Sequence, residues 1–130
     1  MTTFDAIGIA GTALDVHRQW LDAISDNIAN MNDITSTSGN AFQARYIDAQ
    51  AGPGDSGVYV AGSELGSAAG IVEYDPTNPL ADANGDVRTP DIDLGDQMSS
   101  LIMAQRGYQA NADVVTQAKT MYEAAIQIGH

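Results

Sequence analysis

The sequence predicts a mainly α-helical protein in which long N- and C-terminal helices pack as an antiparallel, coiled-coil-like hairpin, with a short β-rich segment between them. Two of the observations behind this prediction are stripes of apolar residues with helical spacing, one near each end of the chain. The third is a middle segment that holds all four prolines and has no long helical period. We therefore divide the chain into an N-terminal helix (residues 1–32), a β- and loop-rich middle segment (33–92) and a C-terminal helix (93–130).

The N-terminal helix is predicted from apolar residues that recur every three or four positions, with His17 as the one polar member of the stripe. The stripe consists of Ile7, Ala10, Leu14, His17, Leu21, Ile24, Ile28 and Met31. We interpret His17 as a packing histidine rather than a proton donor, because no partner for it lies nearby in sequence. The helix is expected to end within residues 27–32, where three asparagines suit a C-cap and a turn.

The middle segment contains short apolar or alternating stretches separated by clusters of turn-forming residues. The stretches lie at 41–49, 57–61 and 70–74, and the turn clusters at 52–55, 75–79 and 84–85. This pattern predicts a few short strands that form a hairpin or a small sheet.

The C-terminal helix is predicted from large apolar residues that recur at every seventh position: Leu94, Leu101, Tyr108, Val115 and Tyr122. Asp93 suits the N-cap, and Asp96 lies in the first turn, where a negative charge favours the helix dipole. Gly107, inside the helix, costs about 1 kcal/mol relative to alanine. Close approach by a neighbouring backbone would explain this glycine, and neutral drift is the alternative that stays open. A two-helix hairpin leaves part of each stripe uncovered, so packing against other subunits and an ordinary intramolecular hairpin both stay open.

Composition excludes several classes of function. The formal net charge of −12 opposes binding to nucleic acid or to an anionic membrane surface. Without cysteine, the chain has no disulfide, thiolate zinc site or cysteine nucleophile. No apolar run approaches the roughly 20 residues that span a bilayer, and no cleavable signal peptide is evident. We expect no catalytic residue and no cofactor, because no nucleophile or phosphate-binding motif occurs.

A calcium site is the one metal alternative. Residues 75–86 are rich in oxygen ligands, but Gly85 arrives one position too early for an EF-hand loop and no glutamate closes it. The Asn84-Gly85 pair is itself a strong turn signal. We therefore predict a turn and no metal site.

Two signatures at the ends of the chain resemble a known family. Asp26-Asn-Ile-Ala-Asn30 closes the first helix, and Ala104-Gln-Arg-Gly-Tyr-Gln-Ala-Asn111 lies in the last. Together with the motif from Val72 to Asp82 between them, they make the chain similar to the bacterial flagellar basal-body rod and hook proteins. Its length suits a short, proximal rod subunit.

The resemblance implies a structural, axial protein rather than an enzyme. Such a subunit polymerises helically through its terminal helices into the drive shaft around the export channel. Its partners are other rod proteins, the rod base and further copies of itself. Its expected location is the basal body, in the periplasmic rod, after export through the flagellar type III apparatus without a cleaved signal. A cytoplasmic helical adaptor that uses the same stripe is the alternative.

The expected interface combines apolar stripe residues with polar residues that set register between helices. Its members are Leu14, Leu21, Ile24, Asn27, Ile28, Asn30, Leu101, Arg106, Tyr108, Asn111, Val115 and Tyr122.

Overall fold

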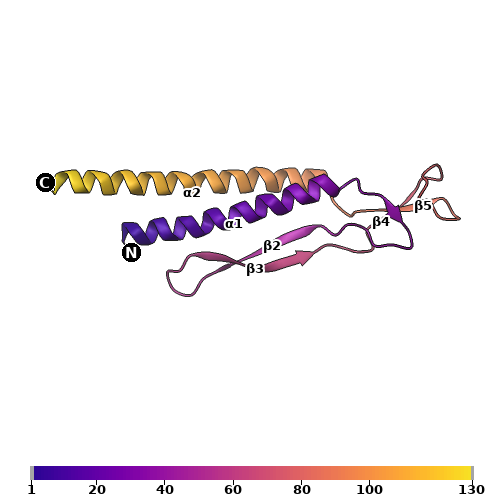
Figure 1. The fold of residues 1–130 in the computed structure, drawn as a ribbon, viewed down its shortest axis with the longest axis horizontal. Coiled ribbons are helices and arrows are strands. Elements are labelled where there is room, and N and C mark those ends of the chain that lie inside the picture. The colour runs from indigo at the N-terminus through magenta and orange to yellow at the C-terminus, as the bar shows by residue number, and fades with distance from the viewer. Residues whose placement is uncertain (1, 130) are drawn as a thin grey trace. The chain divides into compact units, whose positions relative to one another are not determined.

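The computed structural model describes residues 2–129 and confirms the predicted fold: two long terminal helices pack together, with small antiparallel β sheets between them in the sequence (Figure 1). The elements in chain order are α1 (Thr3–Asn30), β1 (Thr35–Ser36), β2 (Arg45–Ala51), β3 (Val58–Leu65), β4 (Ile71–Tyr74), β5 (Asp86–Thr89) and α2 (Leu94–Ile128). Both helices lie inside the predicted terminal segments. The division into three domains stays a prediction.

Side-chain caps fix where both helices begin. The Thr2 backbone N–H donates to Asp5 Oδ2 at 2.7 Å, and the Asp5 N–H donates to Thr2 Oγ1 at 3.2 Å, which is the reciprocal pattern of a capping box. Hydrogen bonding of the Asp5 carboxyl to the Thr2 backbone N–H, and secondarily to the Thr2 side chain, lowers the pKa of that carboxyl below its ordinary value. At α2 the Asp96 N–H donates to Asp93 Oδ1 at 2.9 Å, as the predicted N-cap requires.

The chain folds as two compact units, each assembled from separate stretches of sequence. Unit 1 comprises residues 1–21, 47–62 and 102–130, and unit 2 comprises 22–46 and 63–101. Both helices and the two-stranded sheet of β2 and β3 therefore contribute residues to each unit.

Within unit 1, α1 packs against the β2–β3 hairpin through a contact that requires glycine. Thr12 Oγ1 accepts a hydrogen bond from the Val58 N–H at 3.1 Å. A Cβ at Gly57 would lie 2.3 Å from the same Thr12 Oγ1, and Gly57 also has a φ of +86°. Glycine therefore permits both the hairpin turn and its close approach to the helix.

Unit 2 contains a three-stranded sheet with the order β1-β5-β4, in which both pairs are antiparallel. Its register places Thr35 opposite Arg88 and Ile71 opposite Thr89. Val87, on the central strand, is 1% exposed and belongs to the core of the unit.

The strand predictions were correct for β3 and β4 but incomplete. The stretch predicted at 41–49 becomes a strand only from Arg45, because Ala41 and Ala44 lie in an irregular segment and are buried. The sequence did not predict β1 or β5. These strands of two and four residues form through pairing with distant residues rather than through their own pattern.

Candidate functional site

In unit 1, α1 and α2 contact each other through His17 and Gly107. The His17 Nδ1 lies 2.7 Å from the Ala13 carbonyl oxygen, so this nitrogen carries the proton and donates it. A Cβ at Gly107 would lie 2.2 Å from His17 Nε2, on the opposite side of the ring. Gly107 therefore makes room for an imidazole. The predicted close approach is correct, but the prediction that a backbone makes it was wrong.

An aromatic contact joins the start of α1 to α2 further along unit 1. The rings of Phe4 and Tyr122 pack edge to face, with centroids 5.1 Å apart and an interplanar angle of 66°. Phe4 is nevertheless 63% exposed and Tyr122 43% exposed. These two aromatic side chains therefore keep about half of their surface uncovered within the chain.

In unit 2, a buried asparagine joins three segments. Asn27 Nδ2 donates to the Arg45 carbonyl at 3.0 Å and to Gln97 Oε1 at 3.1 Å, while Asn27 Oδ1 accepts from the Arg45 N–H at 2.8 Å. Asn27 is 1% exposed and Gln97 4%. The Arg45 guanidinium also forms an ion pair with Asp26 at the surface. The helix ends at Asn30, inside the predicted range, so Asn27 lies in its last turn and joins segments instead of capping the helix.

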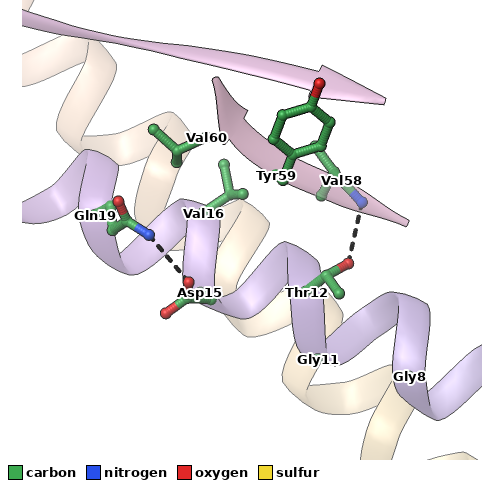
Figure 2. Close-up of a pocket in the computed structure, with 9 residues that line it drawn as sticks. All are labelled: Gly8, Gly11, Thr12, Asp15, Val16, Gln19, Val58, Tyr59 and Val60. Atoms are coloured by element: carbon green, nitrogen blue, oxygen red, sulfur yellow. Dashed lines mark hydrogen bonds between the residues drawn. The ribbon is translucent and has the colours of Figure 1, made fainter. Parts of the chain in front are cut away.

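An open groove of about 680 Å³ lies between α1 and the β2–β3 hairpin of unit 1. Figure 2 shows Val16 of α1 and Val60 of β3 at this groove. At one end of the groove the lining residues of α1 are Gly8 and Gly11, which have no side chain to cover the helix backbone. Within the groove, Gln19 Nε2 donates to Asp15 Oδ2 at 3.0 Å. The lining holds one carboxylate and no nucleophile with an adjacent base, so its chemistry suits packing rather than catalysis.

The predicted interface residues differ in how much of their surface the chain itself covers. Ile24 and Asn27 are buried, and Arg106, Tyr108 and Tyr122 are exposed. The others are half-buried: Leu14, Leu21, Ile28, Asn30, Leu101, Asn111 and Val115. Whether they meet other subunits stays a prediction.

The polar members of the predicted interface are mostly engaged within their own chain. The Asn30 side chain donates to the Asp26 carbonyl at 2.8 Å, and that of Asn111 to the Gly107 carbonyl at 2.8 Å. Among residues 2–129, the Arg106 guanidinium has no hydrogen-bond or ion-pair partner. Unlike the three asparagines of the predicted interface, Arg106 thus has a side chain that is free, as far as residues 2–129 show, to bind another molecule.

A second apolar stripe on α2 was missed by sequence reasoning. Met103, Val114, Met121 and Ile128 are 57%, 46%, 67% and 85% exposed, respectively. Their separations of eleven and seven residues bring them to one face of an α-helix. The spacing was visible in the sequence, but the heptad that begins at Leu94 accounted for the helix without it. We call these four residues the second stripe.

The acidic loop between β4 and β5 is organised by its own hydrogen bonds. Asp75 Oδ1 accepts a bond from Thr77 Oγ1 at 2.8 Å, and Asp82 Oδ1 accepts bonds from the Asn84 and Asp86 N–H groups at 2.8 and 3.0 Å. The Thr77 hydroxyl chiefly lowers the pKa of Asp75, and the Asp86 N–H that of Asp82. The carboxylates of this loop thus stabilise a turn.

The sequence of this chain is similar to those of several known proteins. A family model described as "Flagellar basal body rod FlgEFG protein C-terminal" matches residues 83–128. The flagellar basal-body rod protein FlgC of Salmonella typhimurium is 34% identical, and that of Escherichia coli O6:H1 is 33% identical, each over 99% of both chains. The FlgC protein of Bacillus subtilis is 29% identical over 99% of both chains.

The chain belongs to the FlgC family of flagellar basal-body rod proteins. As a FlgC-family protein it is a structural rod subunit rather than an enzyme, and it is located in the basal-body rod. Membership in the FlgC family implies rod-assembly partners. Within residues 2–129, no helix combines the length and apolar character needed to cross a membrane.

Proposed function

We propose that this rod subunit polymerises helically through α1 and α2, forming the drive shaft around the export channel. In this proposal the terminal helices form the inner layer, and the middle segment (33–92) faces outward or contacts adjacent subunits. Its partners are further copies of the chain, other rod proteins and the rod base. The observation that carries the proposal is the second stripe, because four large apolar side chains on one helix face remain at least 46% exposed.

Exposed apolar surface of this extent favours association. Fully burying one large apolar side chain contributes roughly 1.5–3 kcal/mol, so covering the exposed 46–85% of each second-stripe residue contributes several kcal/mol in total. Monomeric soluble proteins rarely leave large contiguous apolar patches uncovered. A neighbouring subunit that covers this stripe would bury the surface and hold α2 from a side that its own chain leaves open.

Arg106 is proposed to set register between subunits. Its exposed guanidinium presents five donors, and a dry helix interface favours a carboxylate or carbonyl group opposite it. The predicted interface residues Leu14, Leu21, Leu101, Tyr108 and Val115 then contribute the part of their surface that remains uncovered.

We further propose a periplasmic position for the rod, with delivery through the flagellar type III apparatus without a cleaved signal. A chain whose helices lack part of their packing is only marginally stable before assembly, which favours passage through a narrow export channel. Circular dichroism of the isolated chain tests this step. A fully helical monomer that melts sharply at high temperature would contradict it.

The substitution Met121→Asp tests the interface. Because Met121 is 67% exposed in the single chain, the added charge should leave the helical content and melting temperature of the monomer nearly unchanged. In the assembled rod the same charge would be buried without a partner, and assembly should fail.

Swimming of a deletion strain complemented with Met121→Asp, together with electron microscopy of its basal bodies, measures this effect. Thr120→Asp is the matched control, since it places the same charge on an exposed, polar position of the same turn. Normal rods in the Met121→Asp strain would refute the role of the second stripe. Equal loss in both strains would show that the charge, rather than its position, causes the defect.

A further inference from the structure

The strand β4 forms an open edge of the sheet in unit 2. In the order β1-β5-β4 it pairs with β5 alone among the strands of residues 2–129. Every residue of β4 is exposed, with Ile71 at 50%, Val72 at 55% and Tyr74 at 71%. An exposed edge strand with apolar side chains is a template on which another extended segment can pair.

The hydrogen-bond phase of the sheet determines which backbone groups of β4 face outward. The Asp75 N–H donates to the Gly85 carbonyl at 2.9 Å, directly beyond the Tyr74–Asp86 pair. Because bonding alternates along an antiparallel pair, Glu73 and Ile71 also bond to β5, whereas the N–H and C=O groups of Val72 and Tyr74 point away from it.

The backbone of β5 shows the same alternation of hydrogen bonding. The Asp86 carbonyl, opposite Tyr74, faces away from β4 and accepts the Asp82 N–H at 3.0 Å. Val72 and Tyr74 therefore present two donors and two acceptors at the edge, in the spacing that an added strand requires.

The charge of unit 2 selects the kind of segment that can bind. Its stretches of sequence contain eleven aspartate and glutamate residues against two arginines, giving a formal net charge of −9, while unit 1 carries the remaining −3. Glu73 lies on β4 and Asp75 directly follows it. Both arginines are engaged within the unit, since Arg45 pairs with Asp26 and Arg88 donates to the carbonyls of Thr37 and Ala69.

We propose that the β4 edge binds an extended, cationic segment of a partner protein by strand addition. The backbone of Val72 and Tyr74 supplies the hydrogen bonds, Ile71, Val72 and Tyr74 supply apolar contacts, and the acidic surface attracts lysine or arginine side chains. A second copy of this chain is a poor occupant of the edge, because its own unit 2 carries the same charge of −9.

Amide hydrogen exchange of the full chain tests the proposal with a defined probe, a short peptide in which lysine and valine alternate. Binding should slow exchange of the Val72 and Tyr74 amides and leave that of Glu73, which already bonds to β5, nearly unchanged. A matched peptide with glutamate in place of lysine should bind at least about tenfold more weakly at low salt.

Substitutions at Val72 separate backbone pairing from other modes of binding. Val72→Pro removes the outward N–H, and proline is tolerated on an edge strand whose N–H faces solvent. It should weaken binding of the lysine–valine peptide by about tenfold, the loss expected for one hydrogen bond. Val72→Thr keeps the N–H and the β-branched shape, so it should bind like the parent chain.

Several results would overturn the proposal. They are absence of binding, binding without slower exchange at Val72 and Tyr74, equal binding of the glutamate peptide, and unchanged affinity of Val72→Pro. Slower exchange of these amides at high protein concentration without peptide would instead identify a second copy as the occupant. None of these measurements depends on rod assembly, so a negative result would leave the proposed polymerisation untouched.

Discussion

Replacing Gly107 with alanine should destabilise this protein, although alanine is the better helix former. At an exposed helix position the change would gain about 1 kcal/mol. At position 107, however, the added Cβ would lie 2.2 Å from His17 Nε2 and 2.6 Å from His17 Cδ2. The imidazole is not free to turn away, because its Nδ1 is bonded to the Ala13 carbonyl at 2.7 Å.

The expected change in the free energy of unfolding combines the gain in helix propensity with the cost of the clash against His17. Overpacking a well-packed site costs about 1–3 kcal/mol, and losing the His17 hydrogen bond adds about 1 kcal/mol. Because the helix gain offsets about 1 kcal/mol of this cost, Gly107→Ala should lower the free energy of unfolding by roughly 1–3 kcal/mol. In a His17→Ala background the obstruction is gone, so the same substitution should raise stability by about 1 kcal/mol.

Urea denaturation followed by far-ultraviolet circular dichroism measures all four proteins of this cycle. A change of 1 kcal/mol shifts the midpoint by about 0.5 M when the slope is about 2 kcal/mol per M. Gly11→Ala is the matched control in α1, since a Cβ added there would meet nothing within 4 Å in residues 2–129 beyond its chain neighbours and the adjacent helix backbone, and it should stabilise the chain by about 1 kcal/mol.

The test depends on whether Gly107→Ala raises or lowers the free energy of unfolding in each background. If Gly107→Ala stabilises the parent chain as much as it stabilises His17→Ala, the coupling between the two positions is zero. His17 and Gly107 would then not be in contact, and the packing of α1 on α2 in unit 1 would be wrong.

Three further predictions concern unit 2. Asn27→Ala should lower the free energy of unfolding by about 2–4 kcal/mol, because it removes the hydrogen-bond partner of the buried Gln97 side chain and of the part-buried Arg45 backbone. Chemical denaturation measures this change against Asn32→Ala, a control at an exposed position. Equal effects of the two substitutions would contradict the network. Gly70→Ala should lower the free energy of unfolding by about 2 kcal/mol or more, since Gly70 has a φ of +56° and a Cβ there would lie 2.2 Å from the Thr89 carbonyl oxygen. Gly62→Ala is the control, because a Cβ at Gly62 would enter open space, and it should lower the free energy of unfolding by less in the same denaturation assay. The lowered pKa of Asp82 means that its contribution to stability is present above the ordinary aspartate pKa and is lost as pH falls through the lower, folded-state pKa. The amide chemical shifts of Asn84 and Asp86 should therefore titrate at a pH below the ordinary aspartate pKa, and Asp82→Asn should abolish that titration.

The helices could be predicted from sequence because their signals are local. A stripe at three- and four-residue spacing and the cap at Asp93 depend only on neighbours along the chain. The strands β1 and β5 gave no such signal, since Ser36 pairs with Val87 and neither strand has a repeating pattern. Short strands of this kind exist because a distant partner completes their hydrogen bonds.

Contacts between distant residues also limited how much of the candidate site could be predicted from the sequence. The energetic cost of Gly107 predicted a close neighbour, but only the fold identifies it as His17. Asn27 suited a helix end by residue type, yet its partner Gln97 lies seventy positions away, and no spacing rule connects them. The second stripe was visible in the sequence, and it was missed because a single heptad already accounted for α2.

The uneven distribution of charge reconciles an acidic chain with self-assembly. A subunit of net charge −12 would repel its copies if the charge lay on the associating surface. The second stripe belongs to unit 1, which carries only −3, whereas the β4 edge belongs to unit 2, which carries −9. Contacts between copies through unit 1 should therefore depend weakly on salt, since they are mainly apolar. Binding of a cationic segment at β4 should weaken steeply as salt rises, because the Debye length falls from about 10 Å at 0.1 M to about 3 Å at 1 M. The two surfaces are thus separable by ionic strength alone, and a strong salt dependence of self-association would argue against the second stripe as the contact between copies.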